Sequence, residues 1–378
     1  MHAAILPIGN TFVATYILRQ GSNDFSHAMA YQLGCYAGVL ILSYANGWLL
    51  GHISPKTLFG WGIMLTGTVL FAIAALPMLS FGGIALSGVA MGAAGGLFWC
   101  NRNLLVQQAT DEHCRAAFYG FEMFFQSLFL VLTPIAAGLL VTRFPDWGYM
   151  WLGAFTMAVN ALTLALFLPS RFQKETVQLE AFPGRNDFQW RLVLLSDAVK
   201  GIAQAFLMLI PAVMVMRNLG GNEAGVGVVQ SLGGIASGVG VLWLGGRLGH
   251  RGEVRLLAAA GILYALASIW MGVVFDSTAL SWLLGSVILA QPALDLGFFP
   301  IQMDATDRAR LRCGGSLYSY IAAHETAYFI GRAVGIGLFL GAWQLGGEFW
   351  AMRIALPALA VAHLASIPLA AKIASGLN

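Results

Sequence analysis

Long apolar stretches separated by short polar segments run along the whole chain. A helix that crosses the hydrocarbon core of a bilayer needs about 20 apolar residues, because it rises 1.5 Å per residue through roughly 30 Å. Twelve stretches meet this requirement, at 2–19, 27–50, 58–78, 81–107, 116–142, 147–169, 191–216, 224–246, 255–275, 279–302, 314–341 and 349–371. The pattern predicts an all-α polytopic membrane protein with 12 transmembrane helices.

The basic residues sort to one side of these spans. A chain that begins in the cytoplasm would place fourteen Lys and Arg on the cytoplasmic side, four outside and two within spans, which together make the 20 of the chain. The four outer ones are Arg19, Arg143, Arg217 and Arg353, and the two inside spans are Lys200 and Arg332. Cytoplasmic loops carry the excess of positive charge in membrane proteins. We therefore predict a protein of the cytoplasmic (inner) membrane with both termini in the cytoplasm.

Composition agrees with this class. Hydrophobic residues make up 58% and charged residues 10%, whereas soluble domains carry about 25% charged residues. The net charge of +3 reads as a topology signal and indicates no nucleic-acid partner. The four cysteines, Cys35, Cys100, Cys114 and Cys313, are scattered, which favours small apolar residues in a reducing compartment.

A polar interval at 170–190 divides the chain into two parts of six spans. We predict an N-terminal six-helix bundle at 1–169, a cytoplasmic central loop at 170–190 and a C-terminal six-helix bundle at 191–378. A short repeat supports the division, because Ala109-Thr110-Asp111 follows span four and Ala305-Thr306-Asp307 follows span ten. Thr and Asp in these places can cap the next helix.

The loops after spans two and eight keep parts of a known signature, Gly-x-x-x-Asp-(Arg/Lys)-x-Gly-Arg-(Arg/Lys). Gly47 and Lys56 remain in the first copy, and Arg247, Gly249 and Arg251 in the second. On its topology and these positions the whole chain resembles the twelve-helix transporters of the major facilitator superfamily. The resemblance implies two six-helix bundles that alternate access to a central site, with the loop motif taking part in the conformational change.

Span five carries a second partial match, to a pattern that antiporters of this family often show. Gly120, Pro134 and Gly138 match it, whereas Phe129 is a bulky departure. A bendable helix with small residues suits an exporter, and it also suits ordinary close packing of helices. The pattern favours export mildly.

Charged and amide side chains gather in particular spans. Span seven contains Asp197, Lys200 and Gln204 on one face. One interpretation is a structural Asp197–Lys200 ion pair. The other is that Lys200 contacts an anionic substrate, or a carboxylate on another helix, near the bilayer midplane where transporters bind substrate.

Spans ten and eleven contain further polar residues: Gln291, Asp295 and Gln302 in the first, and His324, Glu325 and Arg332 in the second. A carboxylate in a site that alternates between dry and wet can bind and release a proton, and histidine titrates in the same range. We predict that Asp295 and Glu325 carry protons, with His324 and Arg332 beside them. The alternatives are a static Glu325–Arg332 pair and a neutral packing role for His324.

The N-terminal half is poorer in charge. Asn10, Trp99 and, from the other half, Phe298 are predicted to line the substrate cavity together with Lys200, Asp197, Gln204 and Gln291. Arg102 and Glu122 are predicted to form a gate at the inner mouth, whereas the alternative for Arg102 is that its side chain reaches the membrane surface.

The sequence lacks a Walker-type phosphate loop, HExxH and any Cys/His cluster with zinc spacing. We therefore expect no cofactor, no metal and no enzymatic activity. The prediction is a secondary active transporter, acting as a monomer in the lipid bilayer, that moves a small organic solute with protons. The alternatives are an uncoupled facilitator, a flippase for lipids or amphiphiles, and a receptor or scaffold that kept a transporter fold.

Overall fold

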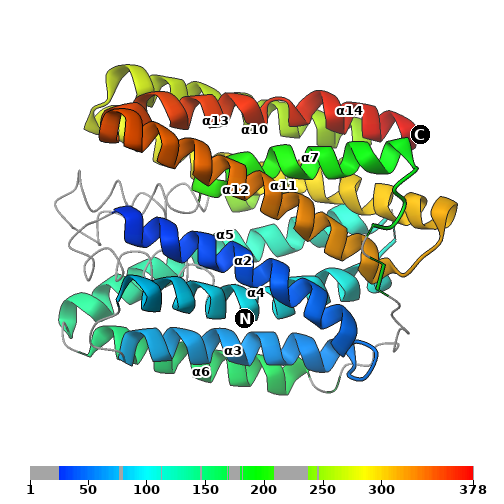
Figure 1. The fold of residues 1–378 in the computed structure, drawn as a ribbon, viewed down its shortest axis with the longest axis horizontal. Coiled ribbons are helices and arrows are strands. Elements are labelled where there is room, and N and C mark those ends of the chain that lie inside the picture. Colours follow the sequence, from blue (N-terminus) through cyan, green and yellow to red (C-terminus); the bar gives the residue numbers. More distant parts are fainter. Residues whose placement is uncertain are drawn as a thin grey trace. The chain divides into compact units, whose positions relative to one another are not determined.

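The computed structural model describes residues 25–75, 80–111, 113–144, 147–167, 169, 179–180, 182–207, 237–244 and 247–377. Their ordered elements are helices (Figure 1). They are α2 (Phe25–Leu49), α3 (Pro55–Ala75), α4 (Phe81–Ala109), α5 (Arg115–Arg143), α6 (Gly148–Phe167), α7 (Phe188–Leu207), α10 (His250–Val274), α11 (Ser277–Cys313), α12 (Leu317–Trp350), the π-helix η3 (Ala351–Ala355), α13 (Leu356–His363) and α14 (Ser366–Leu377).

These helices coincide with the predicted spans wherever the structure describes the chain. Within the described residues, 8 helical segments are long and apolar enough to cross a membrane. Helix α7, which carries Arg191, Asp197 and Lys200, is not among them. The predicted span 2–19 and most of 224–246 lie outside the described residues.

Three predicted spans differ most from the structure. Span eleven was placed at 314–341, but α12 runs from Leu317 to Trp350, with non-helical backbone at Gly346 and Gly347. Span ten was placed at 279–302, but α11 continues to Cys313, because hydropathy marks the end of the hydrocarbon and not the end of the helix. The last predicted span, 349–371, consists of η3, α13 and α14. Pro368 stands four residues after Leu364 and has no backbone N–H to donate to the Leu364 carbonyl, which fits the break between α13 and α14.

The two copies of the repeated tripeptide have different roles. Asp111 precedes α5, and its carboxylate accepts the backbone N–H groups of His113 and Cys114, each at 3.0 Å, as a cap does. The predicted cap at Thr306-Asp307 is wrong, because both residues lie inside α11. Thr306 donates its hydroxyl to the carbonyl of Gln302 one turn earlier.

The described chain forms two compact units. One contains residues 1–109, 133–183 and 315–326, and the other contains 110–132, 184–314 and 327–378. The first unit thus includes a short segment from beyond the central loop, and the second includes one from before it. The division into bundles at 170–190 stays a prediction.

Helices α2 and α4 of the first unit approach each other closely through glycines. Gly34 and Gly38 recur one turn apart on α2, and Gly88 and Gly92 do so on α4. An ideal Cβ on Gly92 would lie 1.9 Å from the carbonyl oxygen of Cys35. The absence of side chains at these positions is therefore what lets the two backbones meet.

Helices α7 and α12 of the second unit meet in the same way. An ideal Cβ on Gly331 would lie 2.0 Å from the Ala198 carbonyl oxygen, and one on Gly201 would lie 2.6 Å from that of Tyr328. This contact brings the polar faces of α7 and α12 together.

We expect Gly92→Ala to destabilise the protein by about 1–3 kcal/mol, as overpacking of a close-packed interior does. The added methyl would overlap backbone of α2, which a side-chain rotation cannot relieve. Thermal unfolding in detergent measures the effect. Gly82→Ala on the same helix is the matched control, because an ideal Cβ there meets nothing within 4 Å. Equal unfolding temperatures for the two variants would contradict this account of the packing.

Candidate functional site

Three polar residues of the second unit lie near the middle of long helices. Asp295 is 18 residues from either end of α11, since 295 − 277 and 313 − 295 both equal 18. Lys200 is 12 residues after the start of α7, which corresponds to about 18 Å of helix. Arg332 is 15 residues after the start of α12. The depth of Lys200 is close to half the thickness of a hydrocarbon core of roughly 30 Å, and Asp295 and Arg332 stand at the midpoints of helices longer than one crossing.

Lys200 and Asp295 form an ion pair. The Lys200 Nζ lies 2.9 Å from Asp295 Oδ1, and the side chains are 2% and 15% exposed. A charge placed in a membrane interior needs a partner or contact with water. The pairing corresponds to the second interpretation of Lys200, contact with a carboxylate on another helix.

Two aromatic rings face the same ammonium group. Lys200 Nζ lies 4.2 Å from the ring centroid of Phe298 and 3.9 Å from that of Phe299. The Phe299 ring stacks on Tyr119 at 5.5 Å, and the Tyr119 hydroxyl donates to the Met303 sulfur at 3.1 Å. One turn of α11 thus supplies the carboxylate and both rings, because residues three and four apart share a helix face.

The neighbouring polar residues extend this cluster along α7. Gln302 donates its amide N–H to Asp197 at 2.9 Å, one turn before Lys200. Arg332 donates to the side-chain oxygen of Gln204 at 3.0 Å, one turn after it, where Gly201 and Gly331 bring the backbones of α7 and α12 together. Gln291, half-buried, stands one turn before Asp295 on α11.

Other predicted residues lie in the first unit. His324 and Glu325 are buried in α12, 8% exposed each. Tyr318 accepts from Asn46 at 2.8 Å. Tyr318 stands seven residues before Glu325 on the same helix.

The residues predicted for the gate at the inner mouth do not share one unit. Arg102 donates to Asn103 at 2.8 Å and lies 5.9 Å from the Trp99 ring centroid. Glu122 belongs to the other unit, so the gate between Arg102 and Glu122 stays a prediction. Asn10 lies outside the described residues.

The loop-motif residues are held by local contacts. Gly47 lies in the last turn of α2, and an ideal Cβ there would be 2.9 Å from Leu179. Arg247 donates to the Trp243 carbonyl at 3.2 Å, Gly249 is the residue before α10, and Arg251 is exposed in the first turn of α10.

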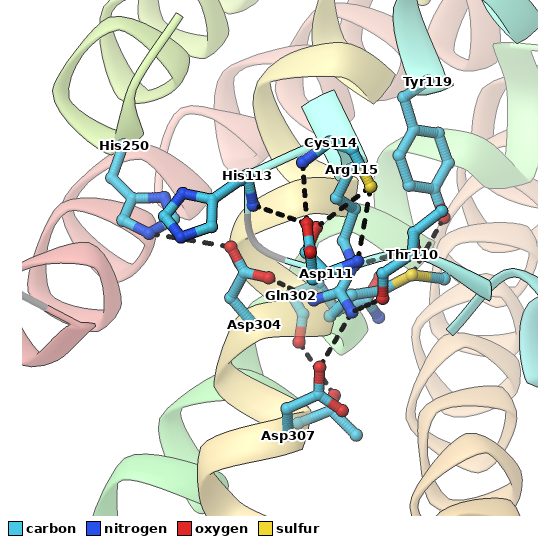
Figure 2. A network of polar contacts seen from close by, with 12 residues as sticks. Thr110, Asp111, His113, Cys114, Arg115, Tyr119, His250, Gln302, Asp304 and Asp307 are labelled. Atoms are coloured by element: carbon cyan, nitrogen blue, oxygen red, sulfur yellow. Dashed lines mark hydrogen bonds and ion pairs between the residues drawn. The ribbon is translucent and has the colours of Figure 1, made fainter. Parts of the chain in front are cut away.

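A second charged cluster surrounds Arg115 at the start of α5 (Figure 2). Arg115, 1% exposed, forms ion pairs with Asp304 and, at 2.8 Å, with Asp307, both on α11. The same guanidinium donates to the Thr110 carbonyl at 3.1 Å. Since two N–H groups reach two carboxylates and a third contact reaches backbone, the start of α5 is fastened to the polar end of α11.

His250 at the start of α10 joins this cluster. Its Nδ1 lies 2.9 Å from Glu253 and its Nε2 lies 3.6 Å from the second oxygen of Asp304. Neutral imidazole has one N–H, whereas the protonated ring has two donors. The arrangement with a carboxylate at both nitrogens therefore favours the protonated form of His250.

Two carboxylates that precede helices are stabilised as anions. The hydrogen bonds from Cys114, with that from the His113 backbone N–H, hold the pKa of the Asp111 carboxyl below its usual value. Burial acts to raise the pKa of Asp187, but the hydrogen bonds from Arg312 at 2.7 Å and from the Trp190 N–H outweigh it and lower the pKa.

Sequence reasoning did not assign Asp304, Glu253, His250 or the pairing role of Arg115. Arg115 was counted only as a cytoplasmic loop charge. The signal available was the spacing of Asp304 and Asp307, three residues apart beyond an apolar span, which places two carboxylates on one helix face. Their partner on α5 could not be inferred, because it is 189 residues away in the chain.

We expect Arg115→Ala to destabilise the protein by about 3–5 kcal/mol, the usual effect of leaving one member of a buried ion pair without its partner. Thermal unfolding of the purified protein measures it. Arg312→Ala is the matched control, because Arg312 is 45% exposed in its pair with Asp187 and should cost about 1 kcal/mol or less. A control variant that unfolds as early as Arg115→Ala would contradict the assignment.

Comparison with known proteins agrees with the membrane fold described above. Residues 8–351 match the family model described as Major Facilitator Superfamily. An uncharacterized protein of Bacillus subtilis, YqgE, is 22% identical over 364 residues, which cover 95% of this chain and 84% of that protein.

Solved structures agree in fold. The human organic anion transporter MFSD10 superposes with a TM-score of 0.65 at 13% identity, covering 97% of this chain and 95% of that one. A bacterial homologue of the iron transporter ferroportin superposes with a TM-score of 0.64 at 18% sequence identity, covering 100% of this chain and 99% of that one. The Escherichia coli fucose:proton symporter FucP superposes with a TM-score of 0.64 at 13% sequence identity, covering 100% of this chain and 98% of that one.

The predicted all-α transporter fold is thereby confirmed, and the 8 candidate spans of the described residues are consistent with the predicted twelve helices. Family and fold also make this chain a transporter and not an enzyme. The chain belongs to the Major Facilitator Superfamily and is a multi-pass membrane protein that acts as a secondary transporter.

Proposed function

We propose that this protein is a proton-coupled secondary active transporter that moves a small organic solute across the cytoplasmic membrane. The observation that carries the proposal is the Lys200–Asp295 ion pair, buried near the middle of α7 and α11. A proton on Asp295 would remove the charge that neutralises Lys200. Proton binding and the charge state of the solute site are therefore linked at one pair of side chains.

Glu325 is the second proposed proton carrier, with His324 beside it. Both are buried in α12, on a helix that also carries Arg332 two turns later. Export is the proposed direction, and its support is the Gly120, Pro134 and Gly138 pattern, which lies on the single helix α5. Action as a monomer, with solute bound by Lys200 and Gln204, completes the proposal.

Coupling can be tested in proteoliposomes. A thermal-stability screen of the purified protein against drugs, siderophores, amino acids and lipids first supplies a transported solute. A trapped pH-sensitive dye then reports proton movement when that solute is added. We expect solute-dependent proton movement in the native protein and at least a 10-fold loss in Asp295→Asn with Glu325→Gln, because an amide side chain does not take up the proton that a carboxylate can.

Asp187→Asn is the control, since it changes a carboxylate of the same unit that lies outside the spans. Solute movement that continues unchanged after the pH gradient is collapsed would identify an uncoupled facilitator or a flippase. A protein that binds solute without moving it would be a receptor.

The proposed topology has a direct test in the native cysteines. Cys114 and Cys313 are exposed and stand at ends of helices that the charge pattern places in the cytoplasm. A membrane-impermeant maleimide should label them only after the cells are permeabilised. Cys114→Ser with Cys313→Ser should lose that labelling, because Cys100 is buried and Cys35 is partly buried. Labelling of Cys114 or Cys313 in intact cells would contradict cytoplasmic termini.

A further inference from the structure

The surroundings of Lys200 restrict what kind of solute it can bind. Its ammonium group is 2% exposed and contacts one carboxylate and two ring faces. Ring faces attract a cation but carry no net charge, so they do not neutralise it. Among the described residues, Asp295 is the ion-pair partner in contact with Lys200. Two further charged groups, Asp197 and Arg332, lie near it, and they are hydrogen bonded to Gln302 and Gln204.

The accessible side of this pair is the carboxylate. Asp295 is 15% exposed, compared with 2% for Lys200, so a proton or a solute reaches the pair at Asp295 first. A solute that binds Lys200 must take the position of the Asp295 carboxylate. The group that fits this position is another carboxylate, because it restores the ion pair and its hydrogen bond.

A proton makes that exchange possible. Protonated Asp295 is neutral and would leave the buried Lys200 without a carboxylate in direct contact, which is unfavourable. A solute carboxylate removes this penalty. The proton and the anion therefore bind together, because each makes the binding of the other more favourable.

The rest of the cluster indicates the body of the solute. Phe298, Phe299 and Tyr119 form a continuous group of rings beside the ion pair. Tyr119 and Phe298 are buried and Phe299 is partly exposed, so Phe299 is the ring of this group that can contact an apolar or aromatic part of a solute.

We propose that the Lys200–Asp295 pair is the binding site for an organic monocarboxylate with an apolar body, taken up together with one proton on Asp295. This inference rests on the proposed function and names the substrate class of its site. The proton and the anion move in the same direction, so export through this site requires an outward gradient of the solute that exceeds the inward proton gradient, and otherwise the proton gradient drives uptake.

The test uses three probes of matched shape: 3-phenylpropionate, its neutral amide and 3-phenylpropylamine. Binding to the purified full-length protein is measured by calorimetry between pH 6 and pH 8. We expect the carboxylate to bind at least 10-fold more tightly than the amide or the amine. Its affinity should rise as the pH falls, approaching 10-fold per pH unit, since one proton is bound with each anion.

Variants separate the two members of the pair. Asp295→Asn removes the competing carboxylate, so 3-phenylpropionate should bind at least 10-fold more tightly at pH 8 and lose its pH dependence. Lys200→Gln combined with Asp295→Asn leaves no buried charge at the pair and should abolish binding of the carboxylate. Asp187→Asn should bind like the native protein.

Tighter binding of the amine, pH-independent binding of the carboxylate by the native protein, or no binding of any probe would each overturn the proposal. Failure of the proposed function is distinguishable. Proton-linked binding of 3-phenylpropionate without proton movement in proteoliposomes would refute coupled transport and keep the substrate class. Proton movement with a solute that is not an anion would refute the substrate class and keep coupled transport.

Discussion

Lys200 carries a full charge to the middle of a helix that has to reside in hydrocarbon, and much of the second unit can be understood from that constraint. An isolated ammonium group there would cost at least about 2.5–3.5 kcal/mol. Asp295 neutralises it at 2.9 Å, and two phenylalanine rings cover the side that the carboxylate does not. The neighbouring Asp197 and Gln204 are in turn satisfied by Gln302 and Arg332. Each of these polar groups would be unfavourable alone in hydrocarbon, and each has a polar partner in the cluster.

Glycine makes this cluster geometrically possible. Arg332 reaches Gln204 because Gly201 and Gly331 let α7 and α12 touch with backbone against backbone. In hydrocarbon there is little hydrophobic gain from bringing helices together, so close packing and hydrogen bonds have to supply the attraction. Small residues and polar residues therefore act jointly, since the first set the distance that the second require.

The second cluster, around Arg115, lies at the polar end of α11 and not in its apolar part. Beyond Gln302 the sequence of α11 becomes polar, yet the helix continues for another eleven residues, from 303 to 313. Arg115 binds Asp304 and Asp307 there, while Arg312 binds Asp187. The repeated Ala-Thr-Asp tripeptide thus caps a helix in one copy and receives an arginine inside a helix in the other. The role of each copy of the tripeptide is therefore set by its position relative to the helix and by the residues that contact it.

The linear pattern of apolar residues was sufficient to locate the spans, the fold class and the family, because the thickness of a bilayer imposes one length on every crossing helix. It also singled out Lys200, Asp295 and Arg332, since charges inside apolar stretches are conspicuous in any sequence. Partner choice was a different matter. The spacing within one helix suggested an ion pair between Asp197 and Lys200. The tertiary structure instead pairs Lys200 with Asp295 on another helix, 95 residues away. Arg115 and His250 acquired their roles only through contacts with α11. Periodicity along a chain determines which face of a helix is polar. Which polar faces meet is decided by the packing of helices that are distant in sequence, and no single helix contains that information.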